Sequence, residues 1–162
     1  MSDNPRFYTT SIDAAKTANE IGEIVRQYGA RRYGVEFTDD GEPEGLHFTM
    51  DIPAVGEVPV LLKAQVEGLA RRLDGDREQA RRVAWRQLKS YVEMTLELVE
   101  NGVKQFHEVF LGDVVLDSGR RISEEIEEAG RIPSPHPPES NGSRALPGGR
   151  EVDQEEAPAG RG

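Results

Sequence analysis

The sequence contains no cysteine, few aromatic residues and no long apolar run. The absence of cysteine excludes disulfide scaffolds, thiolate nucleophiles and zinc ribbons, and it is compatible with a reducing cytoplasm. No apolar stretch approaches the roughly 18 residues that a membrane span needs. The opening residues MSDNPRFYTT also lack the basic and apolar segments of a secretion signal. We therefore expect a soluble, unsecreted protein that makes no contact with a membrane.

The common catalytic signatures are missing as well. The sequence contains no GxGxxG, GxxxxGK[ST], GxSxG or HExxH motif. His107 and Glu108 are not followed by the second histidine that a zinc protease requires. The sequence therefore offers no catalytic residue and no cofactor, and it favours a non-enzymatic protein.

The composition divides the chain near Gly130. Residues 131–162 hold six of the ten prolines, five glycines and no aromatic residue. Such a segment buries too little apolar area to offset about 1–2 kcal/mol per residue of backbone ordering. We expect one folded domain over residues 1–130 and a disordered Pro/Gly-rich tail over residues 131–162.

Hydrophobic spacing in residues 1–130 predicts an α+β domain. Helical spacing runs over residues 12–29, with Ser11 as the expected N-cap. Alternating apolar residues then predict an antiparallel meander, with Pro59 placing its last strand at an edge. The expected strands are residues 31–37, 46–52 and 58–64. The expected later elements are a short helix over 65–73, a long helix over 78–101 and a last helix over 122–130. For residues 105–116 the pattern fits either a helix or a strand.

The long helix is the strongest periodic signal. About 24 residues at 1.5 Å each give a length of roughly 36 Å, which is more than a small sheet needs. We therefore expect this helix to mediate self-association, and the protein to be a homo-oligomer. Its apolar stripe consists of Ala80, Ala84, Leu88, Tyr91, Thr95 and Val99.

A basic segment stands out in a chain whose net charge is −10. Seven cations lie within 19 residues: Arg71, Arg72, Arg77, Arg81, Arg82, Arg86 and Lys89. Cations in the first turns of a helix oppose its dipole, so this placement is unusual. Guanidinium groups beside an indole suit phosphate capture and base stacking. The candidate ligand-binding residues are Arg77, Arg81, Arg82, Trp85, Arg86 and Lys89.

The same segment has a second interpretation as an ordinary solvated helix face. In that case Asp74, Asp76 and Glu78 pair with the arginines, and Lys89 pairs with Glu93. Trp85 then belongs to the core or to a subunit interface. Exposed arginines on one continuous surface would favour ligand binding, whereas pairing with carboxylates would favour the second interpretation.

Two acidic regions are candidates for metal binding, although we expect no metal site. His47 and Asp51 share a strand face with Glu36 nearby, but alternation makes an exposed polar face the simpler interpretation. A cluster of carboxylates precedes the second expected strand: Asp39, Asp40, Glu42 and Glu44. This cluster lacks the spacing of an EF-hand, so it is interpreted as a solvated hairpin loop.

Five segments together resemble small uncharacterised proteins encoded by tailed bacteriophages and prophages. They are YTTSID at 8–13, EF at 36–37, LHF at 46–48, RRVAWR at 81–86 and EVFL at 108–111. The similarity lies in their order and spacing over most of residues 7–125, and none of them is a catalytic signature. It implies a bacterial cytoplasmic setting during infection or lysogeny, with the tail as the variable part.

The sequence thus predicts a non-enzymatic phage or prophage accessory protein that acts by binding a partner protein, either of the host or of the phage. The alternative is a binder of single-stranded nucleic acid or a small phosphorylated ligand through residues 71–89. A metal-dependent hydrolase on the sheet face is the weakest of the three hypotheses.

Overall fold

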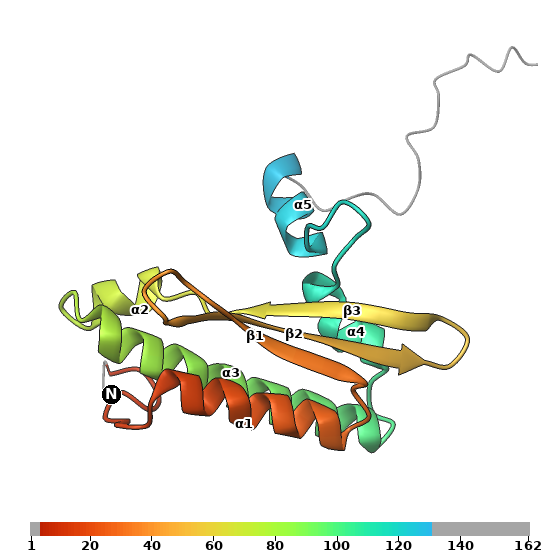
Figure 1. Ribbon diagram of the computed structural model, residues 1–162, viewed down its shortest axis with the longest axis horizontal. Coiled ribbons are helices and arrows are strands. Elements are labelled where there is room, and N and C mark those ends of the chain that lie inside the picture. The colour runs from red at the N-terminus through yellow and green to blue at the C-terminus, as the bar shows by residue number, and fades with distance from the viewer. Residues whose placement is uncertain (1–3, 131–162) are drawn as a thin grey trace, which may run out of the picture. The chain divides into compact units, whose positions relative to one another are not determined.

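The computed structural model describes residues 4–130, which form an α+β fold as predicted (Figure 1). The predicted tail, residues 131–162, lies outside the described residues. In chain order the elements are α1 (Ala14–Gln27), β1 (Arg32–Phe37), β2 (Pro43–Ile52), β3 (Gly56–Lys63), α2 (Glu67–Arg72), α3 (Arg77–Glu100), α4 (Phe106–Phe110), the 3-10 turn η1 (Leu111–Asp113) and α5 (Ile122–Ala129).

The three strands form the predicted antiparallel meander in the order β1-β2-β3. In β2, Leu46 and Phe48 lie on the face that packs against the helices, and their partners on β3 are Leu62 and Val60. Helices α1 and α3 run side by side beneath this face (Figure 1). The alternation in β2 buries one face of the sheet, whereas the other face carries polar residues such as His47, with Leu61 of β3 beside it.

Helix α1 lies close to the sheet because one of its residues has no side chain. A Cβ on Gly22 would lie 2.2 Å from the Tyr33 ring, so the ring packs directly on the helix backbone. The Tyr33 hydroxyl then donates to Glu23 Oε1 at 2.8 Å. The side chain of Asp13 caps the helix by accepting from the backbone N–H groups of Ala15 and Lys16. The prediction of Ser11 as the N-cap is therefore wrong by two residues, because Asp13 is the carboxylate nearest to the free N–H groups.

Residues 105–116, for which the sequence allowed either helix or strand, contain both a helix and isolated β-bridges. Helix α4 packs Phe106 and Phe110 against Phe48, with the Phe48 and Phe110 ring centroids 5.9 Å apart. The chain then passes the outer edge of β3, where Val114 forms an antiparallel bridge with Val60. The chain then forms α5, on the opposite side of the sheet from α1 and α3 (Figure 1).

Trp85 is the largest fully buried side chain of the core, with no exposed surface. Its indole N–H donates to the carbonyl of Pro43 at 3.2 Å, which links the middle of α3 to the first residue of β2. The side chain therefore supplies both apolar contact and a satisfied buried donor.

We expect Trp85→Ala to lower the free energy of unfolding by about 3–5 kcal/mol, because it opens a large cavity in the core. Trp85→Phe should cost less, since it retains part of the aromatic packing, although it leaves a smaller cavity and removes the hydrogen bond to Pro43. Urea denaturation followed by circular dichroism measures both. Val55→Ala is the control, because Val55 is exposed and should change stability by no more than about 0.5 kcal/mol. A Trp85→Ala loss as small as that of the control would contradict the central role of this residue.

Candidate functional site

The structure removes Trp85 from the predicted ligand-binding set. No face of the buried indole is open to a base, and its N–H is already bonded to Pro43. The expectation that Trp85 provides a stacking surface is therefore wrong, and the alternative interpretation of Trp85 as a core residue is confirmed.

All five predicted cations take part in ion pairs. The pairs are Arg77 with Glu67, Arg81 with Glu42, Arg82 with Glu78, Arg86 with Glu20, and Lys89 with both Glu20 and Glu93. The local pairs, Arg82 with Glu78 and Lys89 with Glu93, match the solvated-face interpretation. Asp76 instead caps α3 by accepting from the backbone N–H of Gln79. Most of the partners come from other elements, which sequence spacing alone does not reveal.

The predicted cations also divide between different parts of the molecule. Arg77 and Arg81 line a cleft between the β1–β2 turn, α2 and the start of α3. Arg86 and Lys89 point to α1, where Glu20 accepts from both at 3.2 and 2.8 Å. The hydrogen bond from Lys89 is the main cause of a lowered pKa at the Glu20 carboxyl. These cations therefore do not form the single exposed basic surface that a nucleic-acid strand would follow.

The outer side of α3 carries a feature that the sequence analysis missed. A hollow of about 410 Å³ has Phe7, Tyr91, Met94 and Leu98 among its lining residues, and we call it the α3 groove. The exposed fraction of Met94 is 64%. Tyr91, predicted to lie in the apolar stripe, is also exposed, although its hydroxyl donates to the carbonyl of Val109.

The N-terminal segment forms one wall of this groove. The side chain of Gln79 donates to the carbonyls of Tyr8 and Thr10, and Gln87 donates to that of Arg6. Phe7 adopts a left-handed backbone conformation, with φ of 66°, and its ring lies under the guanidinium groups of Arg6 and Arg86. The helical periodicity of α3 gives no sign of these contacts, because they join residues far apart in the sequence.

Charges are segregated along α3. The first half, residues 77–89, carries five cations and one carboxylate, whereas residues 90–100 carry three carboxylates and no cation. Arg6 lines the α3 groove and Arg86 lies over the Phe7 ring that also lines it, whereas Glu97 is exposed near the end of α3, outside the groove lining. A helix docked antiparallel to α3 with the same charge order would meet opposite charges at both ends.

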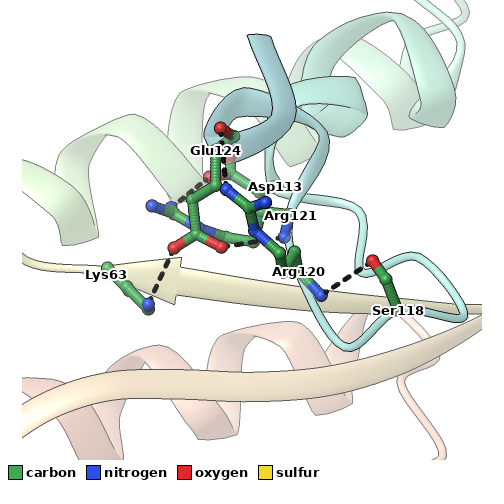
Figure 2. Close-up of polar contacts among 6 residues, drawn as sticks. All are labelled: Lys63, Asp113, Ser118, Arg120, Arg121 and Glu124. Atoms are coloured by element: carbon green, nitrogen blue, oxygen red, sulfur yellow. Dashed lines mark hydrogen bonds and ion pairs between the residues drawn. The ribbon is translucent and has the colours of Figure 1, made fainter. Parts of the chain in front are cut away.

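A cluster of charges around the buried Arg121 joins α5 to β3 (Figure 2). The Arg121 side chain is 8% exposed, and it lies 3.3 Å from both Asp113 and Glu124. Glu124 also accepts from Lys63 at 2.8 Å and from the backbone N–H of Arg121 at 2.9 Å. These bonds attach the segment after α4 to the end of β3, so the cluster is best explained as a structural tether.

The pKa values of the two carboxylates in this cluster are shifted in opposite directions. The hydrogen bond from Lys63, followed by that from the Arg121 backbone, lowers the pKa of Glu124 to about 2. Burial raises the pKa of Asp113, and Arg121 counteracts part of that rise. The folded state therefore favours the ionised form of Glu124 and opposes that of Asp113.

The predicted polar face of the sheet does not assemble a metal site in residues 4–130. His47 Nδ1 lies 3.8 Å from Glu36 Oε1, while Asp51 is engaged by Arg31. The acidic turn is a hairpin loop, as predicted, but Glu42 in it pairs with Arg81. The weakest of the three hypotheses, a metal-dependent hydrolase on this face, gains no geometric support.

Comparison with known proteins adds no identification: no protein-family model, no curated protein and no solved structure matches the chain. Over the described part of the chain, no helix has both the length and the apolar character to span a bilayer.

We expect Glu124→Gln to be less stable than the wild type at pH 7, and the difference to shrink as the pH falls. The ordinary glutamate pKa of about 4.3 applies to the unfolded chain, so the stabilisation by ionised Glu124 is complete above about pH 5. It is lost as the pH falls towards the folded-state pKa of about 2. Urea unfolding at several pH values between 7 and 3 measures the difference.

Glu127→Gln is the matched control, because Glu127 is exposed on the same helix and makes no side-chain ion pair within residues 4–130. A difference between Glu124→Gln and the wild type that stayed constant over this pH range would contradict the lowered pKa.

Proposed function

We propose that the protein is a non-enzymatic accessory protein of a phage or prophage, active in the bacterial cytoplasm, that acts by protein–protein binding. The α3 groove is the proposed binding surface, and a second copy of the chain is the proposed partner. The phage setting depends on the resemblance of the five sequence segments, whereas the binding surface depends on the exposed apolar side chains of α3.

The observation that carries the proposal is the clustering of apolar surface in the α3 groove. Met94 and Tyr91 are exposed on one helix, and Phe7 brings a third large side chain to the same hollow. Contiguous apolar patches with polar surroundings are typical of interaction surfaces, because water leaves them on association. The pairing of the cations with carboxylates further favours this function over a broad phosphate-binding surface.

Charge complementarity favours a second copy as the occupant. When two α3 helices pack antiparallel about a two-fold axis, each contributes the same surface to the interface. Met94 of one copy then lies near the middle of the contact. Arg6, the cation that lines the groove, then lies towards the acidic half of the other α3, which carries Glu97. One surface, the outer side of α3 with the N-terminal segment beside it, thus supplies both the apolar contact and the charges around it.

We expect the wild type to be a dimer at micromolar concentration and Met94→Asp to be a monomer. The substitution places a carboxylate at the centre of the apolar contact, where its desolvation opposes association. Sedimentation equilibrium measures the mass of each species. The expected weakening of self-association is at least tenfold.

Val55→Asp is the matched control, because Val55 on the β2–β3 turn is 65% exposed and does not line the α3 groove. It should leave the dimer unchanged, and circular dichroism should report the same fold for both variants. A monomeric wild type at 100 µM would overturn the proposed partner. Equal dissociation by both variants would overturn the proposed surface.

A further inference from the structure

The cleft next to α2 is separate from the α3 groove and has the size of a small-molecule site. It occupies about 520 Å³ at the end of the sheet, between the β1–β2 turn, the end of β3, α2 and the start of α3. Pockets of about 300–1,000 Å³ are typical of sites for small ligands and cofactors. Residues from several distant parts of the chain converge on it, so its shape depends on the folded domain.

Cations outnumber carboxylates among the residues that line this cleft. Lys63, Arg71, Arg77 and Arg81 supply four positive charges, of which Lys63 is already bonded to Glu124, whereas Glu44 and Glu67 supply two negative charges. Lys63 comes from β3, Arg71 from α2, and the other two from α3. Convergence of cations from three elements on one concave surface is what recognition of a small anion requires.

Two of these arginines have donors to spare. Arg81 is only 20% exposed, and within residues 4–130 its single ion pair is a 3.4 Å contact with Glu42 that forms no hydrogen bond. Arg71 is exposed and makes no ion pair in this part of the chain. A guanidinium carries five N–H donors, so both side chains can bind an anion without losing an existing hydrogen bond.

Arg77 already holds an anion in the geometry that a phosphate would take. Its two terminal nitrogens donate to the two carboxylate oxygens of Glu67 at 3.0 and 2.7 Å. Both side chains are more than half exposed, and an exposed ion pair contributes only about 0–1 kcal/mol. Glu67 is therefore a weakly held internal competitor for the place of a phosphate group.

We propose that this cleft binds a small phosphorylated molecule of nucleoside diphosphate size, with its phosphates held by Arg71, Arg77 and Arg81 in place of the Glu67 carboxylate. The net charge of −10 opposes a long polyanion, whereas charges screened beyond about 8–10 Å leave a single diphosphate under the influence of the cleft. The buried Trp85 offers no stacking surface for a nucleic-acid strand. A small ligand fits these constraints better than single-stranded nucleic acid.

Isothermal titration calorimetry of the full chain with ADP, inorganic pyrophosphate and adenosine tests the proposal. ADP and pyrophosphate should bind, and adenosine should not. Arg71→Ala and Arg81→Gln should each weaken ADP binding at least tenfold. Glu67→Gln should tighten it severalfold, because it removes the competing charge from Arg77.

Arg82→Gln is the matched control, because Arg82 neighbours Arg81 on α3 and pairs with Glu78 but does not line the cleft. It should leave ADP binding unchanged, and circular dichroism should show that all variants fold. Absence of binding at millimolar ADP and pyrophosphate would overturn the proposal. So would an equal effect of Arg82→Gln, weaker binding by Glu67→Gln, or a single-stranded oligonucleotide binding more tightly than ADP.

Discussion

The burial of Trp85 fixes the position of α3 on the sheet, and both proposed binding surfaces depend on that position. A three-stranded meander has one apolar face, so the helices that cover it must reach all three strands. The indole of Trp85 fills the core while its N–H bonds the carbonyl of Pro43. With α3 held in this way, its first turns form a wall of the cleft, and its outer side from Gln87 to Leu98 remains available for the α3 groove.

Carboxylates from other elements resolve the electrostatic conflict at the start of α3. Arginines in the first turns of a helix are unfavourable, because they meet the positive end of its dipole. Glu67 from α2 and Glu42 from the hairpin turn each approach one of these cations, and Glu20 from α1 approaches Arg86 and Lys89 further along the helix. Exposed pairs such as Arg77 with Glu67 contribute little to stability, so the fold tolerates their exchange for another anion.

Local patterns in the sequence predicted the elements of the fold well. The alternation around Leu46 and Phe48 correctly gives the buried face of β2, and Asp74-Gly75-Asp76 correctly separates α2 from α3. The N-cap of α1 was misplaced because Ser11 and Asp13 are both good capping residues, and only the backbone path distinguishes them. Such errors of one or two residues leave the topology unchanged.

The functional surfaces were harder to predict, because they depend on contacts between distant residues. Spacing of three or four residues finds the pair of Arg82 with Glu78, but it cannot find the pair of Arg81 with Glu42. The α3 groove likewise needs Phe7, which the long helix itself does not suggest. The only tryptophan was predicted to stack on a base, yet a single large aromatic residue in a small domain is also the residue that fills its core most effectively.

The two proposed surfaces can be occupied at the same time, because they lie on different sides of α3. Arg77 and Arg81 are one turn apart and face the cleft, whereas Gln87, Met94 and Leu98 follow one another along the α3 groove. At 100° per residue, Met94 is about 140° around the helix from Arg81. A second copy bound at the groove therefore leaves the cleft accessible from α2. The two proposals can therefore be tested separately, since substitutions at Met94 and at Arg71 alter different surfaces, one on α3 and the other on α2.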